Sequence, residues 1–393
     1  MQKKGSVSMP WERKTVDNQR REFVARAVMG EESLSALCRE YGISRPTAYK
    51  WLERYRNGEP MLDKPHTPFR KPFKTRPDVE LRIVDVRSAH PTWGARKIQR
   101  FLVDKGEACV PAPSTIGDIL KRNGCISELA SEQHTPWKRF VRDRPNALWQ
   151  MDYKGHFGMT NGQRCHGLTI LDDHSRFSIC LDAKSDEQWE TTKASLDRVF
   201  REFGLPDAIL CDNGAPWGNS LNGYTPFEIW MMQLDVTPMH GKPRHPQTQG
   251  KDERFHRTLK EDLLLRKPLA DLEEAQKEFD EFRYCYNFER PHGALDFDVP
   301  AKHYRPSDRK VAEKPQEPEY DSGKTLRKVN CNGYVSVYKK RYYLSESFIG
   351  KYLELRPLED DLLALVYGNF EIARIDLQAE KFDSRKIYRI RDV

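Results

Sequence analysis

Three acidic residues have surroundings that point to metal-dependent chemistry: Asp152, Asp212 and Glu253. Asp152 lies within a mostly apolar run typical of a strand, where a carboxylate is costly unless a cation binds it. Asp212 directly follows the apolar run Ala208–Cys211, at the strand end where ligands collect in open α/β sheets. Two such carboxylates would repel each other, and hard divalent cations relieve that repulsion. These residues therefore predict a site for divalent metal ions.

The third acid, Glu253, stands near the start of a predicted helix that follows a polar loop. Arg257 and Lys260 lie four and seven residues further on, so the three side chains share one helical face. An acid and two bases directed towards strand-borne aspartates would suit a metal site with cations that hold phosphates. The neighbouring Asp252 is the rival for the third position, but helix geometry turns it about 100° away.

The elements that must position these acids follow from hydrophobic patterning between residues 146 and 298. Short strands are expected at 148–157, 165–172, 176–183 and 207–211, with an amphipathic helix at 188–203. Three strands, a helix, a further strand and more helices predict an α/β core with a mixed sheet.

The chain has 393 residues, too many for one ordinary domain. Linker-like stretches divide it into four expected domains, at 10–56, 78–125, 146–298 and 325–393. Residues 1–144 carry 29 Lys and Arg against 18 Asp and Glu, so this part is expected to meet a polyanion. No apolar run approaches the ~18 residues of a membrane span.

Residues 10–56 are predicted to form a helix-turn-helix DNA-binding domain. Ser44 is a suitable N-cap for its third helix, whose residues Ala48, Trp51 and Leu52 would face inward. The side chains left facing outward would contact a major groove: Arg45, Thr47, Tyr49, Lys50 and Arg54. A generic three-helix bundle is the alternative.

Residues 78–125 are predicted to form a second helical, winged-helix-like DNA-binding domain. Arg96, Lys97 and Arg100 lie beside apolar residues and are expected to contact DNA. Ser114 is expected to cap a later helix that stops at Gly124. Two basic helical modules joined by a stiff linker suit a long DNA site read in pieces.

Residues 325–393 contain five short strand patterns separated by glycine turns, which predict a small β-barrel. A stabilising cap is an equally good interpretation of this segment. The eight cysteines of the chain include no CxxC pair, which indicates reduced thiols in a cytoplasm. Cys165 beside His166 lacks two further ligands at zinc spacing.

The ordered set of motifs resembles the insertion-sequence DDE transposases of the retroviral-integrase superfamily, which have a ribonuclease-H-like core. The matching motifs are Asp152, Cys211-Asp-Asn-Gly, Asp173-His-Ser-Arg, His245-Pro-Gln-Thr-Gln-Gly-Lys-Asp-Glu-Arg with Lys260, and Tyr286-Asn-Phe-Glu-Arg-Pro-His. The likeness extends over nearly the whole chain and implies an SH3-like barrel at 325–393 that aids DNA contact or subunit assembly.

This resemblance implies that Asp152, Asp212 and Glu253 are catalytic and hold two Mg²⁺ ions, with Mn²⁺ able to substitute. One ion would activate water or a DNA 3′-hydroxyl, and the other would stabilise the leaving oxygen. Arg257 and Lys260 would hold phosphates of double-stranded DNA. The implied reaction is cleavage at terminal inverted repeats and strand transfer into target DNA, by a homo-oligomer in a bacterial cytoplasm.

Two features depart from the retroviral integrases. The spacing from Asp212 to Glu253 is longer, and residues 219–224 are expected to loop out the excess. The zinc-binding His/Cys module at the start of those integrases is missing from this sequence. Trp217 is expected to be a packing residue near the active-site loop. Two rival functions stay open: a non-catalytic DNA-binding regulator, and a metal-dependent nuclease without strand transfer.

Overall fold

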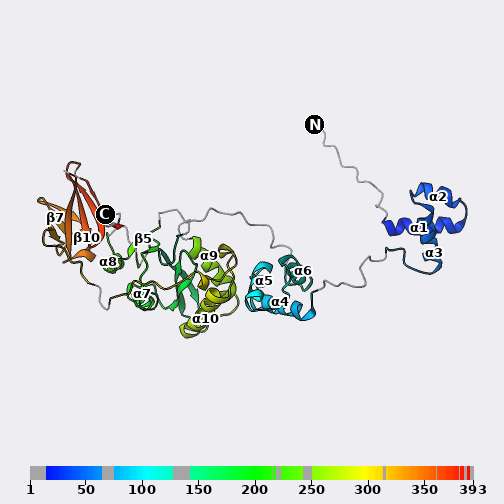
Figure 1. The fold of residues 1–393 in the computed structure, drawn as a ribbon, viewed down its shortest axis with the longest axis horizontal. Helices are drawn as coiled ribbons and strands as arrows, with labels where there is room; N and C mark the ends of the chain where they lie inside the picture. Colours follow the sequence, from blue (N-terminus) through cyan, green and yellow to red (C-terminus); the bar gives the residue numbers. More distant parts are fainter. Residues whose placement is uncertain are drawn as a thin grey trace. The chain divides into compact units, whose positions relative to one another are not determined.

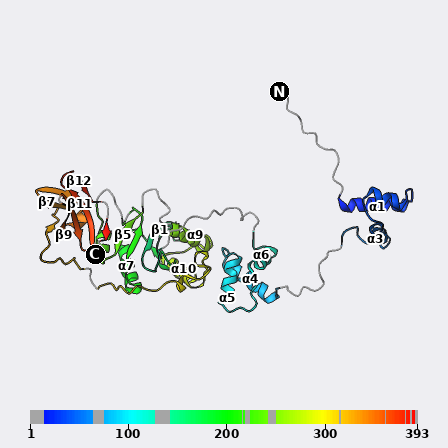
Figure 2. The same ribbon diagram turned by 45° about the horizontal axis from the view of Figure 1, so that its top comes forward.

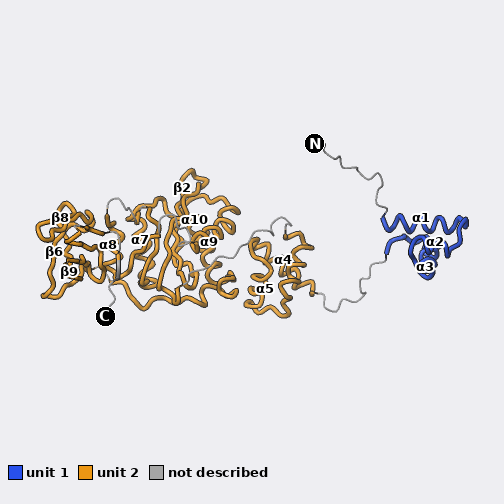
Figure 3. Tube along the Cα trace, turned by 90° about the horizontal axis from the view of Figure 1, so that it is seen from above, with its two compact units in different colours: residues 1–74 blue, residues 75–393 orange. Residues whose placement is uncertain are grey.

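The computed structural model describes residues 15–63, 75–126, 142–214, 216–217, 223–241, 250–312, 316–359, 361–379, 381–384 and 387–389. Several expected features lie partly outside these ranges: residues 10–14 of the first domain, residues 219–222 of the expected loop, the motif residues 245–249, and residues 360, 380, 385–386 and 390–393 of the expected C-terminal domain. The chain divides into two compact units, residues 1–74 and 75–393 (Figure 3). The division into four domains stays a prediction.

In unit 1 the described residues 15–63 form three helices around one small core (Figure 1). They are α1 (Val16–Met29), α2 (Leu34–Glu40) and α3 (Arg45–Arg56). The expected cap of α3 is confirmed, because the Ser44 hydroxyl accepts a hydrogen bond from the Thr47 amide at 3.3 Å. The inward residues of α3 are also as predicted, since Ala48, Trp51 and Leu52 are buried.

Unit 2 begins with a second helical module. It consists of α4 (Pro77–Ala89), α5 (Ala95–Asp104) and α6 (Pro113–Arg122) around its own apolar core. The prediction that Ser114 caps α6 is wrong: the helix starts at Pro113, and its N-cap Ala112 makes no side-chain hydrogen bond. A proline suits the first helical position because it lacks an amide hydrogen, so Ser114 falls inside the first turn.

The α/β core follows, and its mixed sheet is confirmed. Its elements are β1 (Trp149–Gly158), β2 (Arg164–Asp172), β3 (Ser178–Lys184), α7 (Trp189–Phe203), β4 (Ala208–Cys211), α8 (Pro226–Gln233) and β5 (Thr237–His240). The strand order is β3-β2-β1-β4-β5. β1, β2 and β3 pair antiparallel, whereas β4 lies parallel to β1 and β5.

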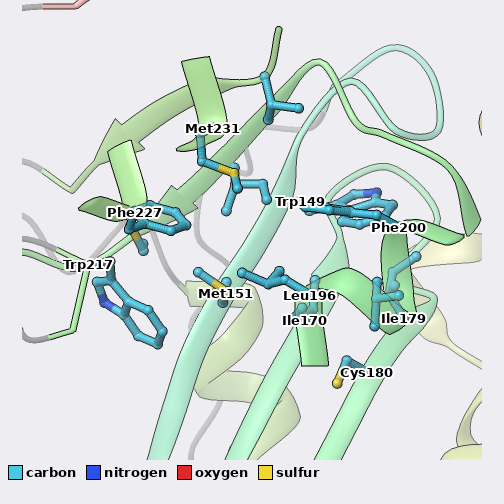
Figure 4. Close-up of a cluster of buried hydrophobic side chains, with 14 of the residues drawn as sticks. Trp149, Met151, Ile170, Ile179, Cys180, Leu196, Phe200, Trp217, Phe227 and Met231 are labelled. Carbon is cyan, nitrogen blue, oxygen red and sulfur yellow. The ribbon is translucent and has the colours of Figure 1, made fainter. Parts of the chain in front are cut away.

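Helices cover the two faces of this sheet. On one face, α7 and α8 pack on Met151, Ile170 and their neighbours, as Figure 4 shows. On the other face lie α9 (Gly250–Leu259) and α10 (Leu272–Tyr284) (Figure 2). Their apolar side chains pack on those of β2 and β3. A π-helical turn, Lys260–Leu264, continues α9. Strands covered on both faces explain the nearly continuous apolar runs of β2 and β3.

The C-terminal part is built of β-strands. Its strands are β6 (Leu326–Lys328), β7 (Tyr334–Val337), β8 (Lys340–Tyr343), β9 (Tyr352–Glu359), β10 (Leu362–Tyr367), β11 (Phe370–Asp376), β12 (Lys381–Asp383) and β13 (Tyr388–Arg389). The main sheet runs β12-β11-β10-β9-β6, with β13 on β11, and β7 pairs separately with β8. Among the described strands no pairing joins β6 to β12, so the SH3-like barrel stays a prediction.

Helix α8 joins the C-terminal sheet to the core. Phe227 and Met231 point into the core of the α/β sheet, whereas Ile229 and Met232 belong to the apolar cluster of the C-terminal sheet. Just before this helix, Tyr224 donates a hydrogen bond to the Ile372 carbonyl. Across the described ranges, no helix is long and apolar enough to cross a membrane.

Candidate active site

Asp152 and Asp212 are brought together by two neighbouring parallel strands. In the pairing of β1 with β4, Trp149 lies beside Ile209 and Gln150 lies beside Leu210. Two residues further along the same register, Asp152 is level with Asp212. Asp152 pairs on its other side with Thr169 of β2, so its side chain lies on the sheet face that α9 covers.

The two aspartates influence each other electrostatically. Burial, and next the charge of Asp212, raise the pKa of Asp152 to about 7. The side chain of Asp152 is still 27% exposed. A divalent cation between the two acids would favour the ionised form, because it opposes both the repulsion and the loss of solvent. Hard carboxylate oxygens in this arrangement fit Mg²⁺.

Asp212 is held by two donors from the turn that follows β4. The indole nitrogen of Trp217 donates to Oδ1 at 2.6 Å, and the Gly214 amide donates to the same oxygen at 3.0 Å. A Cβ at Gly214 would lie 3.0 Å from Oδ2, so glycine leaves room beside that second oxygen. Trp217 is buried in the core cluster (Figure 4). Its ring stacks on that of Tyr153, the residue after Asp152. Sequence reasoning assigned it only a packing role.

Behind Asp212, His240 joins β5 to α8. Its Nδ1 lies 2.9 Å from the Asp212 carbonyl, and its Nε2 lies 3.1 Å from Glu228 Oε1. Although burial lowers the pKa of His240, hydrogen bonds with the Cys211 thiol and Glu228 raise it to about 11. The charged ring therefore donates to both oxygens and fixes the end of β4.

Helix α9 turns different residues towards the sheet than the motif predicted. Glu253 is exposed, as are Arg257 and Lys260. Asp252 is instead fully buried, and neither of its carboxylate oxygens has a hydrogen-bond partner in the described structure. Burial, and next the charge of Asp152, raise the pKa of Asp252 well above its usual value.

The structure therefore places Asp212 level with Asp152 on the sheet and the buried Asp252 close enough to Asp152 for their charges to interact, whereas Glu253 is exposed. Over the described ranges, no three or more His, Cys, Asp or Glu side chains assemble as a complete metal cage. The assignment of Glu253 as the third ligand stays a prediction. The orientation of α9 had a signal in the sequence, because Phe255 and Leu259 mark its inner face and Asp252 precedes Phe255 by three residues.

His256, one turn beyond Asp252, also faces this site. Its Nε2 lies 2.9 Å from Thr169 Oγ1, and its Nδ1 lies 4.0 Å from Asp152 Oδ2. Burial, and then the charge of Lys154, lower the pKa of His256 to about 4, so the ring is neutral at physiological pH. Sequence reasoning did not single out this residue.

The first turn of α9 is anchored by a buried ion pair. Lys251 contacts the carboxylate of Asp173 and donates to the Asp173 carbonyl at 3.0 Å. Asp173 also accepts hydrogen bonds from the Arg142 amide and from Gln150 Nε2. The acidic turn after β2 thus fixes the helix that carries Asp252, Glu253 and His256.

The predicted DNA-contact residues differ in exposure and in whether their side chains already bond to other parts of the protein. Tyr49 and Lys50 are exposed on α3, whereas Arg54 donates to the Leu62 carbonyl at 2.8 Å. Arg45 is exposed but donates to Ser35 Oγ at 2.6 Å, and Thr47 is half-buried.

On α5, Arg96 is exposed and Lys97 is half-buried without a hydrogen bond or ion pair to any described residue. Arg100 forms ion pairs with Asp104 and with Asp298 of the core. Its guanidinium is therefore already engaged, unlike the ammonium of Lys97.

Comparison with protein families identifies the domains in this arrangement. Residues 142–246 and 234–300 match two models described as "Integrase core domain". The chain carries an integrase core. Residues 19–68 match a "Helix-turn-helix domain", and residues 47–120 match a "Homeodomain-like domain". Residues 324–383 match "IS481 family transposase, C-terminal domain". Each of these models matches a part of the chain.

Related proteins agree with this classification. An uncharacterized 39.2 kDa protein of insertion element IS476 from Xanthomonas euvesicatoria is 24% identical over 74% of this integrase-core chain and 78% of its own length. A Gag-Pro-Pol polyprotein of squirrel monkey retrovirus is 35% identical over 32% of this chain, which spans only 6% of that polyprotein.

Two solved structures were also found to be similar. The HTLV-2 integrase catalytic core in complex with magnesium is 18% identical, with a TM-score of 0.32, over 41% of this chain and 99% of its own. A simian T-cell lymphotropic virus intasome in complex with a PP2A regulatory subunit is 16% identical, with a TM-score of 0.36, over 79% of this chain and 99% of its own.

Proposed function

We propose that this chain is a DDE transposase that binds terminal inverted repeats, cleaves the ends of a mobile element and joins them to target DNA. The observation that carries the proposal is the alignment of Asp152 with Asp212 on neighbouring parallel strands of an integrase core. A divalent cation bound between the two carboxylates would relieve their mutual repulsion.

The residues that would hold two Mg²⁺ ions, or Mn²⁺ in their place, are Asp152, Asp212 and Glu253. When bound, these ions supply Lewis-acid stabilisation of the charge that develops on the reacting phosphate. Asp212 presents Oδ2, because Oδ1 already accepts from Trp217 and Gly214. Glu253 is the preferred third ligand by the motif, and Asp252 is its rival by burial.

DNA contact is assigned to several basic surfaces. In unit 1 the exposed side of α3 would read a major groove, chiefly through Tyr49 and Lys50. On the catalytic core, Arg257 and Lys260 project beside Glu253 and would contact backbone phosphates. The C-terminal sheet would aid DNA contact or assembly of a homo-oligomer, as would suit paired DNA ends.

The test is a reaction of purified full-length protein with a labelled terminal-repeat duplex and a plasmid target, in Mg²⁺ or Mn²⁺. Wild type is compared with Glu253→Gln and Asp252→Asn, both of which remove a negative charge while nearly preserving shape. Cleaved and joined products from wild type and Asp252→Asn, but not from Glu253→Gln, support the transposase and the third ligand together.

Other outcomes separate the rival functions. Tight repeat binding without cleavage or joining by any of the three proteins would favour the DNA-binding regulator. Cleavage without joined product would favour the nuclease. Loss of activity in Asp252→Asn with activity retained in Glu253→Gln would transfer the third position to Asp252.

A further inference from the structure

We propose that His256 and Asp152 together hold the water molecule that attacks DNA during end cleavage, and that His256 has no comparable part in strand transfer. The inference rests on the proposed function, and it concerns which of the two chemical steps this side chain serves. It stands on the hydrogen-bond geometry of His256, Thr169 and Asp152.

The contacts of Thr169 determine which ring nitrogen of His256 carries the proton. The Thr169 hydroxyl donates its one hydrogen to the carbonyl oxygen of Asp152 at 2.9 Å, and that carbonyl can only accept. The same hydroxyl lies 2.9 Å from His256 Nε2. Both contacts are satisfied only if Nε2 carries a hydrogen and donates it to the hydroxyl. Nδ1 lies 4.0 Å from Asp152 Oδ2, too far for a direct hydrogen bond, so this geometry places the ring proton on Nε2 and leaves Nδ1 unprotonated.

The free lone pair of Nδ1 faces a carboxylate oxygen. Nδ1 and Asp152 Oδ2 are 4.0 Å apart, and no described residue donates a hydrogen bond to Nδ1. Two acceptors at this separation do not bond to each other, but one water molecule can bridge them. Hydrogen bonds of about 2.8 Å to each acceptor would meet at an angle near 90°, close to that of a water molecule.

A water held in this way is oriented for attack. It donates one hydrogen to Nδ1 and the other to Oδ2, so its lone pairs point away from both and towards an incoming phosphate. In the cleavage step the water oxygen bonds to phosphorus and the bond from phosphorus to the leaving 3′-oxygen breaks. One of the two water protons passes along its hydrogen bond to Nδ1 or Oδ2 and from there to solvent, and solvent returns one proton to the leaving oxygen.

Strand transfer places a different demand on the site. The nucleophile is then a DNA 3′-hydroxyl, which has a single hydrogen and so cannot donate to both acceptors. The hydroxyl is also fixed by the DNA strand that carries it, whose phosphates contact the protein. The orienting contribution of His256 is therefore needed for water and not for the strand end.

Two substitutions of similar shape distinguish the roles of the two ring nitrogens of His256. In His256→Asn the amide oxygen can occupy the position of Nδ1 and keep the acceptor for water. In His256→Gln the amide nitrogen can occupy the position of Nε2 and keep the donor to Thr169, while the acceptor is lost. Both variants lose the imidazole ring and keep a neutral, polar side chain. Each therefore serves as a control for the effect of losing the ring in the other.

Each variant is tested on two substrates: a terminal duplex with flanking DNA, which requires cleavage, and a pre-cleaved duplex, which requires only joining. We expect His256→Gln to lower cleavage about 10²-fold, as for a misplaced nucleophile, and to lower joining by no more than about threefold. His256→Asn should retain cleavage to within about tenfold of wild type. Melting temperatures measured alongside report whether each variant folds.

A product ratio within one reaction removes any dependence on the amount of folded protein. Cleavage in the presence of glycerol gives a hydrolysed 5′-phosphate from water and a glycerol ester from the alcohol. The ester fraction should rise in His256→Gln, because an alcohol hydroxyl has one hydrogen, and stay near the wild-type fraction in His256→Asn.

Equal losses of cleavage and joining in His256→Gln would overturn the inference and point to a structural or metal-binding role. Unchanged cleavage, or an unchanged ester fraction, would also overturn it. Wild-type protein inactive on both substrates would instead contradict the proposed function itself.

Discussion

The indole nitrogen of Trp217 donates a hydrogen bond to Asp212 Oδ1 at 2.6 Å, while its ring stacks on Tyr153 with 5.3 Å between centroids. Trp217 thus contacts one candidate metal ligand directly, and it contacts the neighbour of a second, Asp152. A buried donor to a charged oxygen both stabilises the carboxylate and limits its rotation. Asp212 therefore enters the reaction with one oxygen already fixed.

Replacing Trp217 with Phe should reduce end cleavage about tenfold or more, because Asp212 loses an orienting donor while the aromatic stack survives. The measurement is cleavage of the labelled terminal duplex at saturating Mg²⁺. Trp230→Phe is the matched control: its indole nitrogen is buried without a hydrogen-bond partner among the described residues, so activity should be kept. Equal activity in the two variants would contradict an orienting role for Trp217.

Replacing Lys251 with Met should destabilise the protein by roughly 3 kcal/mol, because the buried Asp173 carboxylate loses its cation. Chemical denaturation of unit 2 at neutral pH measures the change. Adding Asp173→Asn should recover part of the loss. Lys193→Met removes an exposed ion pair with Asp197 and should cost well under about 1 kcal/mol. A similar loss at both lysines would rule out a special role for the buried pair.

Without divalent cations, the stability of the protein should fall as the pH rises from about 4 to about 7. The folded pKa of Asp152 lies above that of an exposed aspartate, so ionisation of Asp152 works against the fold over this interval. We expect a contribution on the order of 2 kcal/mol. Melting temperatures in EDTA at pH 5 and pH 8 measure it.

The matched variant for this effect is Asp152→Asn, which has no charge to acquire and should show a weaker pH dependence. Mg²⁺ at pH 8 should raise the melting temperature of wild type and have little effect on the variant. Identical pH profiles in EDTA would show that Asp152 is not the group responsible.

Lys97 should contribute to DNA binding more than its neighbours on α5. Burial, and then the charges of Arg290 and Arg254, lower its pKa to about 7. A backbone phosphate placed among these cations would relieve their repulsion. Lys97→Ala should weaken binding of the terminal duplex at pH 6.5 and reduce the salt dependence by about one phosphate contact.

Arg100 is the comparison for Lys97, because its guanidinium is held by Asp104 and Asp298. Arg100→Ala should leave the salt dependence of binding nearly unchanged and act mainly on the contact between α5 and the core. Fluorescence anisotropy at several salt concentrations distinguishes the two variants. A reduced salt slope for Arg100→Ala alone would reverse this assignment.

Much of the fold follows from local patterns. Alternating and apolar runs predict β1 to β4, and Ser44 predicts the start of α3, because neighbouring residues alone set these preferences. The start of α6 is missed by two residues, because Ser114 is predicted as the N-cap, whereas the N-cap is Ala112 and Pro113 opens the helix. β5 and α8 are missed because both are short and apolar without a clear period.

The sequence by itself determined the strand positions of Asp152 and Asp212, because each acid interrupts or directly follows an apolar run. Only the tertiary structure decided which side chains lie beside these two aspartates. Helical spacing fixes the angles between Asp252, Glu253 and His256, but packing of Phe255 and Leu259 on the sheet decides which of them turn inward. The hydrogen bond from Trp217 to Asp212 likewise depends on the path of the turn after β4, which no local preference specifies.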